Sequence, residues 1–122
     1  MRFLNSKILG VDFGDCHDFL LEMYFENCDL TLSSFYGLTL KNRRFVSCKL
    51  QEVDFTNADL SASVFDNCDL HKALFENTNL EKADFRTARH YSIDPELNRI
   101  KKAKFSIPDV VGLLDRYDLS IQ

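Results

Sequence analysis

Residues 65–85 read FDNCDLHKALFENTNLEKADF, and a large apolar residue stands at every fifth position of this stretch. These residues are Phe65, Leu70, Phe75, Leu80 and Phe85. A period of five fits neither an α-helix, with about 3.6 residues per turn, nor a strand, whose side chains alternate between its faces. A chain that turns after every five residues would send all of these side chains into one interior. The stretch therefore predicts a solenoid, in which stacked coils bury a continuous column of side chains.

The same five-residue spacing of large apolar residues extends through most of the chain. Phe and Leu alternate strictly at every fifth position from Leu20 to Phe85, and in most repeats a smaller residue lies two positions earlier. Each short side would thus bury one large and one small residue and expose the others. The predicted core column is Phe25, Leu30, Phe35, Leu40, Phe45, Leu50, Phe55, Leu60, Phe65, Leu70, Phe75, Leu80, Phe85 and Phe105.

The length of one coil follows from two patterns with a spacing of twenty residues. Cys28, Cys48 and Cys68 are twenty apart, which predicts a column of inward cysteines. Opposite charges on neighbouring strands stabilise each other by roughly 0.2–1 kcal/mol. A coil of twenty residues has four sides of five residues each. Charges of alternating sign recur at the same spacing, at Asp29, Lys49, Asp69 and Arg89. A coil of twenty residues would place these opposite charges next to one another.

Two interruptions of the five-residue spacing are expected to change the column locally. Phe13 and Leu20 are seven residues apart, so we expect a bulge near residues 14–19 that lets Phe13 stack over Phe35 in a 22-residue coil. The five-residue spacing is also lost in residues 89–99, although Phe105 still lies twenty residues after Phe85. We therefore divide the chain into a β-helix over residues 1–107, with an irregular coil at 89–99, and a C-terminal cap over residues 108–122.

The tandem motif resembles the A(D/N)LXX repeat of the pentapeptide-repeat proteins. Ala58-Asp59-Leu60 and Ala83-Asp84-Phe85 carry the resemblance, which covers about residues 3–107. It implies an all-β solenoid, a right-handed quadrilateral parallel β-helix of about five coils with a solid core. Four sides per coil agree with the twenty-residue spacing found above.

The C-terminal stretch AKFSIPDVVGLLDRYDLSIQ, residues 103–122, resembles the end of the quinolone-resistance members of this family. In those proteins a helix and a short strand cap the column and join two subunits tail to tail, so the resemblance implies a homodimer. Ser106 and Asp109 predict a capped helix, and apolar residues spaced by two predict a strand after it. The tail either only caps the column or also forms the dimer interface. The residues concerned are Val110, Val111, Leu113, Leu114, Tyr117, Leu119 and Ile121.

Length and composition bound the class of protein. The chain has 122 residues, enough for one domain with a buried core, and 45% of them are hydrophobic. The net charge of −4 argues against nonspecific binding to nucleic acid or to anionic membranes. We find no apolar run as long as a membrane span, and we expect no signal peptide. Four cysteines without a CxxC pair favour a reducing setting, so we expect a cytoplasmic protein.

No constellation of residues predicts catalysis. His17, His71 and His90 are isolated in sequence, and we find no Ser/His/Asp or Cys/His arrangement suited to nucleophilic catalysis. The four glycines are scattered, so no phosphate-binding loop is predicted. The inward cysteines lack the tetrahedral closure of a zinc site and are expected to be small core residues, with Cys16 more accessible. We expect no enzyme activity, no cofactor and no metal.

Acidic residues are concentrated in the middle of the chain. Residues 50–85 hold eight of them against only Lys72 and Lys82. Most stand at outward positions, where they either solvate the column or present a negative surface to a basic protein groove. The predicted acidic surface is Glu52, Asp54, Asp59, Asp66, Asp69, Glu76, Glu81 and Asp84.

Basic residues break this pattern at two places, within residues 41–49 and within residues 101–104. Arg43 stands where a small inward residue belongs. A buried guanidinium without a partner is costly. We therefore expect a local bulge, or a kinked side, that lets Arg43 reach solvent.

Two functions are compatible with these features. The first is a non-catalytic binding or scaffold protein that presents a rigid acidic β-helix surface to a protein partner. The alternative, implied by the resemblance of the tail, is a mimic of duplex DNA that binds DNA gyrase or another topoisomerase and protects it from quinolones or toxins. The short column and the absence of a long projecting loop in the sequence count against the alternative. Neither function requires direct contact with nucleic acid or membrane.

Overall fold

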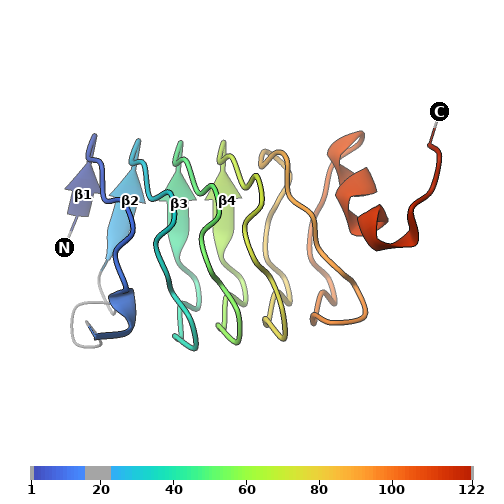
Figure 1. Cartoon of the computed structure of the whole chain (residues 1–122), viewed down its shortest axis with the longest axis horizontal. Helices are drawn as coiled ribbons and strands as arrows, with labels where there is room; N and C mark the ends of the chain where they lie inside the picture. The colour runs from blue at the N-terminus through green and yellow to red at the C-terminus, as the bar shows by residue number, and fades with distance from the viewer. Residues whose placement is uncertain (1, 16–22, 122) are drawn as a thin grey trace.

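The computed structural model describes residues 2–15 and 23–121, and these form one column of stacked, four-sided coils (Figure 1). One side of the column is a parallel sheet of four short strands, in the order β1-β2-β3-β4. These are β1 (Arg2–Leu4), β2 (Tyr24–Glu26), β3 (Arg44–Val46) and β4 (Val64–Asp66). The described residues also form the short 3₁₀ helices η1 (Phe13–Asp15), η3 (Asp109–Leu113) and η4 (Asp115–Tyr117). In the described part of the chain, no helix is long and apolar enough to cross a membrane.

The register of the coils confirms the twenty-residue period. Phe25, Phe45 and Phe65 are direct neighbours in the sheet. The first coil is two residues longer, as the pairing of Phe3 with Phe25 shows. Each coil bonds to both neighbours, since Lys49 N donates to Cys28 O (2.9 Å) and the next amide, Leu50 N, donates to Asp69 O (2.8 Å). The backbone hydrogen bonds of one coil are therefore satisfied only when another coil is stacked on it.

The repeated Asp and Asn residues are explained by the turns between the sides. Asp54 Oδ1 accepts a hydrogen bond from Thr56 N (2.9 Å), and Asp59 Oδ1 accepts one from Ser61 N (3.0 Å). The corner residue that follows is left-handed, as at Asn57 (φ 59°). Asn tolerates this conformation better than most residues, and Gly tolerates it best, as at Gly37 (φ 71°).

The core is a stack of phenylalanine and leucine side chains. Rings twenty residues apart lie parallel, as in Phe35 and Phe55, whose centroids are 5.5 Å apart at 6°. Every residue of the predicted core column from Phe25 to Phe85 is buried, while Phe105 is only partly buried because it lies in the last coil. Phe13 stacks on Phe35 at 4.6 Å, although Cys16 and most of the predicted bulge lie outside the described residues.

The prediction of a bulge at Arg43 is wrong. The ladder is unbroken here, because β3 begins at the next residue and Val64 N donates to Arg43 O (2.9 Å). Breaking this ladder would leave backbone groups without partners, so the flexible side chain adapts instead. Arg43 remains half-buried in the column of small residues, and its Nε has no hydrogen-bond partner among the described residues.

The tail differs in detail from the predicted helix and strand. Ser106 does not cap a helix, because its hydroxyl donates to Arg86 O (2.6 Å), and the helical segment is the pair of 3₁₀ helices η3 and η4. After η4, Asp118 adopts a left-handed conformation (φ 50°) that redirects the chain. No strand forms in residues 118–121, so the strand predicted from Tyr117, Leu119 and Ile121 is not observed in this described segment.

Candidate interaction surface

The predicted acidic surface is not one surface. Its eight residues occupy all four sides of the column, two on each side. Five of them are paired with cationic or imidazole groups. The pairs are Asp59 with Lys41 (3.8 Å), Asp66 with Arg44 (2.8 Å), Asp84 with Arg86 (2.8 Å), Glu81 with Arg99 (2.8 Å) and Asp69 with His90 (3.0 Å). The sequence sum over residues 50–85 thus overstated the negative field, because four of these acids pair with cations from outside that range, Lys41, Arg44, Arg86 and Arg99.

The pairs also affect the carboxyl groups. The Arg86 guanidinium beside Asp84 lowers the pKa of that carboxyl, against the opposing effect of partial burial. Exposed pairs of this kind contribute little stability. They reduce the charge that is available to a partner.

One side of the column carries acids and no basic residue. This acidic side consists of residues 11–15, 33–37, 53–57, 73–77 and 93–97, which follow one another along the column through bridges such as Asp12 to Ser34 and Ser34 to Asp54. The charged residues of these segments whose side chains the structure describes are Asp12, Asp54, Glu76, Asp94 and Glu96. The only cation paired with them there comes from the tail, where Arg116 binds Asp94 (2.9 Å) and Glu96 (2.7 Å).

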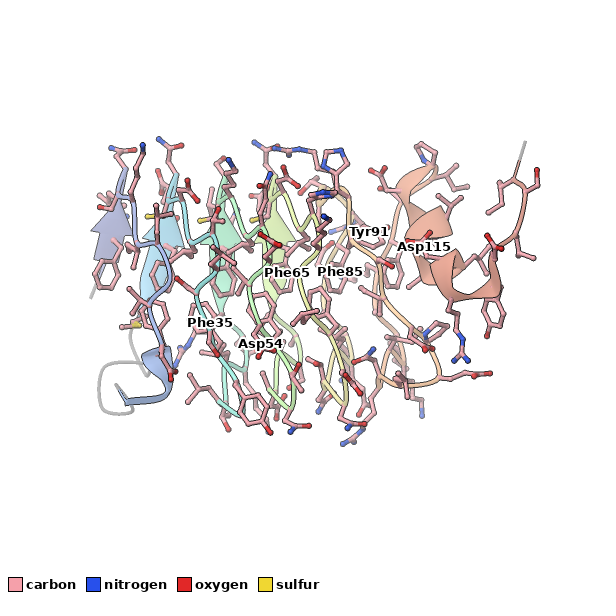
Figure 2. All side chains as sticks on the ribbon, viewed as in Figure 1. Phe35, Asp54, Phe65, Phe85, Tyr91 and Asp115 are labelled. Atoms are coloured by element: carbon pink, nitrogen blue, oxygen red, sulfur yellow. The ribbon has the colours of Figure 1, made fainter. Side chains whose placement is uncertain are left out.

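The acidic side also exposes large apolar groups. Tyr36 and Leu74 are each 54% exposed and Leu97 is 46% exposed, all at outward positions. The Tyr36 hydroxyl accepts a hydrogen bond from Asn57 Nδ2 (2.8 Å), which fixes the ring on the surface. Apolar anchors surrounded by charged groups are typical of protein interfaces. Asp54 lies at the middle of the column in Figure 2.

The repeated architecture has a counterpart among known protein families. A family model described as the pentapeptide repeat region matches residues 20–90, more than half of the chain. The chain belongs to the pentapeptide-repeat family. No curated protein matches it.

Solved structures of other pentapeptide-repeat proteins are similar in fold. A trypsin-treated form of QnrB1, a plasmid-mediated fluoroquinolone resistance protein, is 18% identical with a TM-score of 0.54. The match covers 99% of this chain and 58% of QnrB1, so this chain spans less than two thirds of its length. Rfr23 from the cyanobacterium Cyanothece 51142 is 20% identical over 87% of this chain and 88% of its own, with a TM-score of 0.40. At 18% identity the likeness to QnrB1 shows the fold alone, a right-handed β-helix, and together with the four-sided coils it confirms the predicted quadrilateral β-helix.

The ladder of alternating charges lies on the side of the pentapeptide-repeat column before the acidic side. Asp29, Lys49, Asp69 and Arg89 are consecutive bridge partners, and the ladder begins with Lys7 opposite Asp29. Asp29, Lys49 and Asp69 therefore each face opposite charges on both neighbouring coils. This side is locally neutral, unlike the acidic side.

The inward cysteines lie in the wall of the core. Cys28, Cys48 and Cys68 are buried and free, and each thiol donates to a carbonyl of the preceding coil, as Cys68 does to Phe45 O (3.3 Å). The hydrogen bond with the Cys48 sulfur and burial raise the pKa of the Cys68 thiol. Thiols with a raised pKa are poor nucleophiles and poor metal ligands. Across residues 2–15 and 23–121, no three metal-ligating side chains converge on one point.

The tail residues divide into two sets. Val110 and Leu113 are partly buried at the end of the column. The remaining five of the predicted cap residues are exposed, and Ile107, just before η3, is 90% exposed. The exposed set is Val111, Leu114, Tyr117, Leu119 and Ile121.

Sequence reasoning missed the acidic side. The sequence does contain the pattern. If every fourth five-residue repeat is grouped, the outward positions of that group include Asp54, Glu76 and Glu96 together with Tyr36 and Leu74. Summing charge along the chain hid it, since consecutive repeats face four different directions.

Proposed function

We propose that this pentapeptide-repeat chain is a non-catalytic binding protein that presents its acidic side to a basic and partly apolar surface of a protein partner. The observation that carries the proposal is the combination on that side of unneutralised carboxylates with the exposed side chains of Tyr36, Leu74 and Leu97. Electrostatic complementarity would steer the partner, and the apolar side chains would supply most of the binding free energy. The free buried thiols support a reducing, cytoplasmic setting.

The column is suited to this role because it is rigid. Its backbone is tied to both neighbouring coils by regular hydrogen bonds, and its aromatic rings are stacked in parallel, as in Phe45 and Phe65, whose centroids are 5.4 Å apart. A surface that does not reorganise on binding loses little conformational entropy. The acidic side is therefore preorganised for its partner.

A matched pair of variants tests this function. Asp54→Asn with Glu76→Gln removes two charges from the acidic side, while Asp59→Asn with Glu81→Gln removes two charges five residues further along each coil, on the next side. Asp54 and Asp59 make the same turn hydrogen bond, which the amide retains. A photo-crosslinking benzophenone amino acid in place of Tyr36 would capture partners in a cell extract.

We expect the first double variant to lose the crosslinked partner and the second to retain it. Equal capture by both variants would rule out the acidic side as the binding surface. Purified partner and isothermal titration calorimetry would then give the affinity of each variant.

A second candidate function is mimicry of duplex DNA toward gyrase. The absence of basic residues from the acidic side favours it, whereas the ion pairs on the other sides argue against mimicry around the whole column. A gyrase supercoiling assay with added protein, with and without ciprofloxacin, tests this candidate. Protection or inhibition that is lost with Asp54→Asn and Glu76→Gln would support it, and no effect at high excess would exclude it.

The exposed tail supports a homodimer as the state in which the protein acts. Five apolar side chains of one short segment are exposed. Two copies that meet tail to tail about a twofold axis would cover them and would double the length of the acidic side.

A further inference from the structure

A cavity lies at the seam where the last coil meets the tail. We call it the seam cavity, and it has a volume of about 310 Å³. Its walls come from three parts of the chain that are distant in sequence. The residues that matter here are His71, His90, Tyr91, Asp109, Gly112 and Asp115.

The tail forms one wall because of close packing at Gly112. Ile93 N donates to Gly112 O (3.1 Å), and a Cβ on residue 112 would lie only 2.2 Å from the Tyr91 carbonyl oxygen. Only glycine permits this approach. It holds Asp109 and Asp115, on either side of it, against the last coil, and Figure 2 shows Tyr91 and Asp115 together at this junction.

The walls are acidic. Asp109 and Asp115 are the charged residues that line the cavity, and neither takes part in an ion pair within residues 2–15 and 23–121. His90 turns its Nδ1 toward Asp69 Oδ1 (3.0 Å), and its ring lies 6.2 Å from that of His71. Imidazole nitrogens and carboxylate oxygens at one site attract a cation.

Tyr91, one of the lining residues, carries a buried hydroxyl that lacks a partner among the described residues. Tyr91 is 3% exposed, packed between Phe85 (5.6 Å) and Phe105 (5.7 Å), and its Oη makes no hydrogen bond to any described residue. Burial and the nearby Asp109 charge raise the pKa of Tyr91 to about 12, so the phenol is neutral and can accept a hydrogen bond. A buried hydroxyl without a partner is costly and uncommon.

An organic cation suits this cavity better than a metal ion. No three ligating side chains of the described residues converge closely enough for a bare metal ion. A cavity of this volume admits an ammonium group with an alkyl chain, whose three N–H donors can bond to oxygens that are further apart. We propose that the seam cavity binds a primary ammonium group between the carboxylates of Asp109 and Asp115, with the Tyr91 hydroxyl as a further acceptor.

The ammonium has two possible sources, a lysine side chain of a protein partner or a free polyamine. The Tyr91 hydroxyl is enclosed, so a small outward movement of η3 and η4 accompanies binding. The site uses no residue of the acidic side. Failure of one proposal would therefore leave the other intact.

The test is a nuclear magnetic resonance titration of the full chain with n-butylammonium, observing the imidazole Hε1 signals of His71 and His90. We expect saturable shifts of both signals. Sodium butyrate and n-butanol, which share the alkyl chain, should give none. Saturation with Nα-acetyl-lysine amide but not with spermidine would identify a lysine side chain as the ligand, and the reverse would identify a polyamine.

Variants of the cavity make the test specific. Tyr91→Phe removes only the hydroxyl and should weaken binding roughly tenfold. Asp109→Asn with Asp115→Asn should abolish saturation. Asp118→Asn, the same change at a tail residue that does not line the cavity, should bind like the wild type. The proposal is overturned if n-butylammonium gives no saturable shift, if butyrate shifts the same signals equally, or if the double variant binds normally.

Discussion

At the scale of single residues, each side of a coil depends on one inward side chain and one turn residue. Leu70 is 0% exposed in the core, whereas its neighbour His71 points outward. Leu70→Arg would place a charge without a partner in the stack, at a cost comparable to the whole stability of a domain, about 5–15 kcal/mol. We expect this variant to be unfolded or insoluble, as judged by circular dichroism of the purified protein. His71→Arg is the control and should fold normally. Soluble, native-like Leu70→Arg would mean that the register is wrong.

A second prediction at this scale concerns Tyr91, where a substitution should stabilise the fold and not destabilise it. Because its buried hydroxyl has no partner, Tyr91→Phe should raise the free energy of unfolding by about 1 kcal/mol. Urea denaturation measures this change. Tyr36→Phe is the control, since the Tyr36 hydroxyl accepts from Asn57 at the surface and its loss should leave stability the same or slightly lower. If Tyr91→Phe is destabilised, the hydroxyl has a partner in solution, and the Tyr91 hydroxyl is not a vacant acceptor in the seam cavity.

At the scale of elements, the attachment of the tail rests on Gly112. Gly112→Ala would bring a methyl group into the Tyr91 carbonyl, so η3 would have to move away and the Ile93 to Gly112 hydrogen bond would break. We expect faster amide hydrogen exchange at Ile93 and faster tryptic cleavage after Arg116, with the coils unchanged. Gly37→Ala is the control, because that position meets no other atom within 4 Å. It should cost about 1 kcal/mol through its positive φ and leave the tail protected.

The column could be predicted from the sequence because one period fixes every coil. The five-residue spacing of large residues and the twenty-residue coil together determine that Phe35 stacks on Phe55, and the structure contains this stack. The tail carries no repeat, and its form depends on single competing contacts. The Ser106 hydroxyl bonds to Arg86 O, twenty residues earlier, and not to the first turn of η3. A contact of this kind cannot be read from local sequence.

The candidate sites were harder to predict for a different reason. The acidic side combines residues from five repeats, and the seam cavity combines the last coil with the tail. His71, His90 and Asp115 are isolated in sequence, so they gave no motif. Stacking brings them together only once the coil length and the position of the tail are known.

At the scale of the whole molecule, the exposed tail predicts the oligomeric state. Leu114 is 38% exposed in the tail, where Val111, Tyr117, Leu119 and Ile121 are exposed as well. In a tail-to-tail dimer with twofold symmetry, Leu114→Glu would place two carboxylates in one apolar interface, and unpaired charges there prevent association. We expect the mass measured by light scattering to fall from that of a dimer to that of a monomer. Leu74→Glu, at an exposed leucine of the acidic side, is the matched control and should leave the mass unchanged. A wild-type chain that is already monomeric, or a Leu114→Glu chain that stays dimeric, would exclude the tail as the interface.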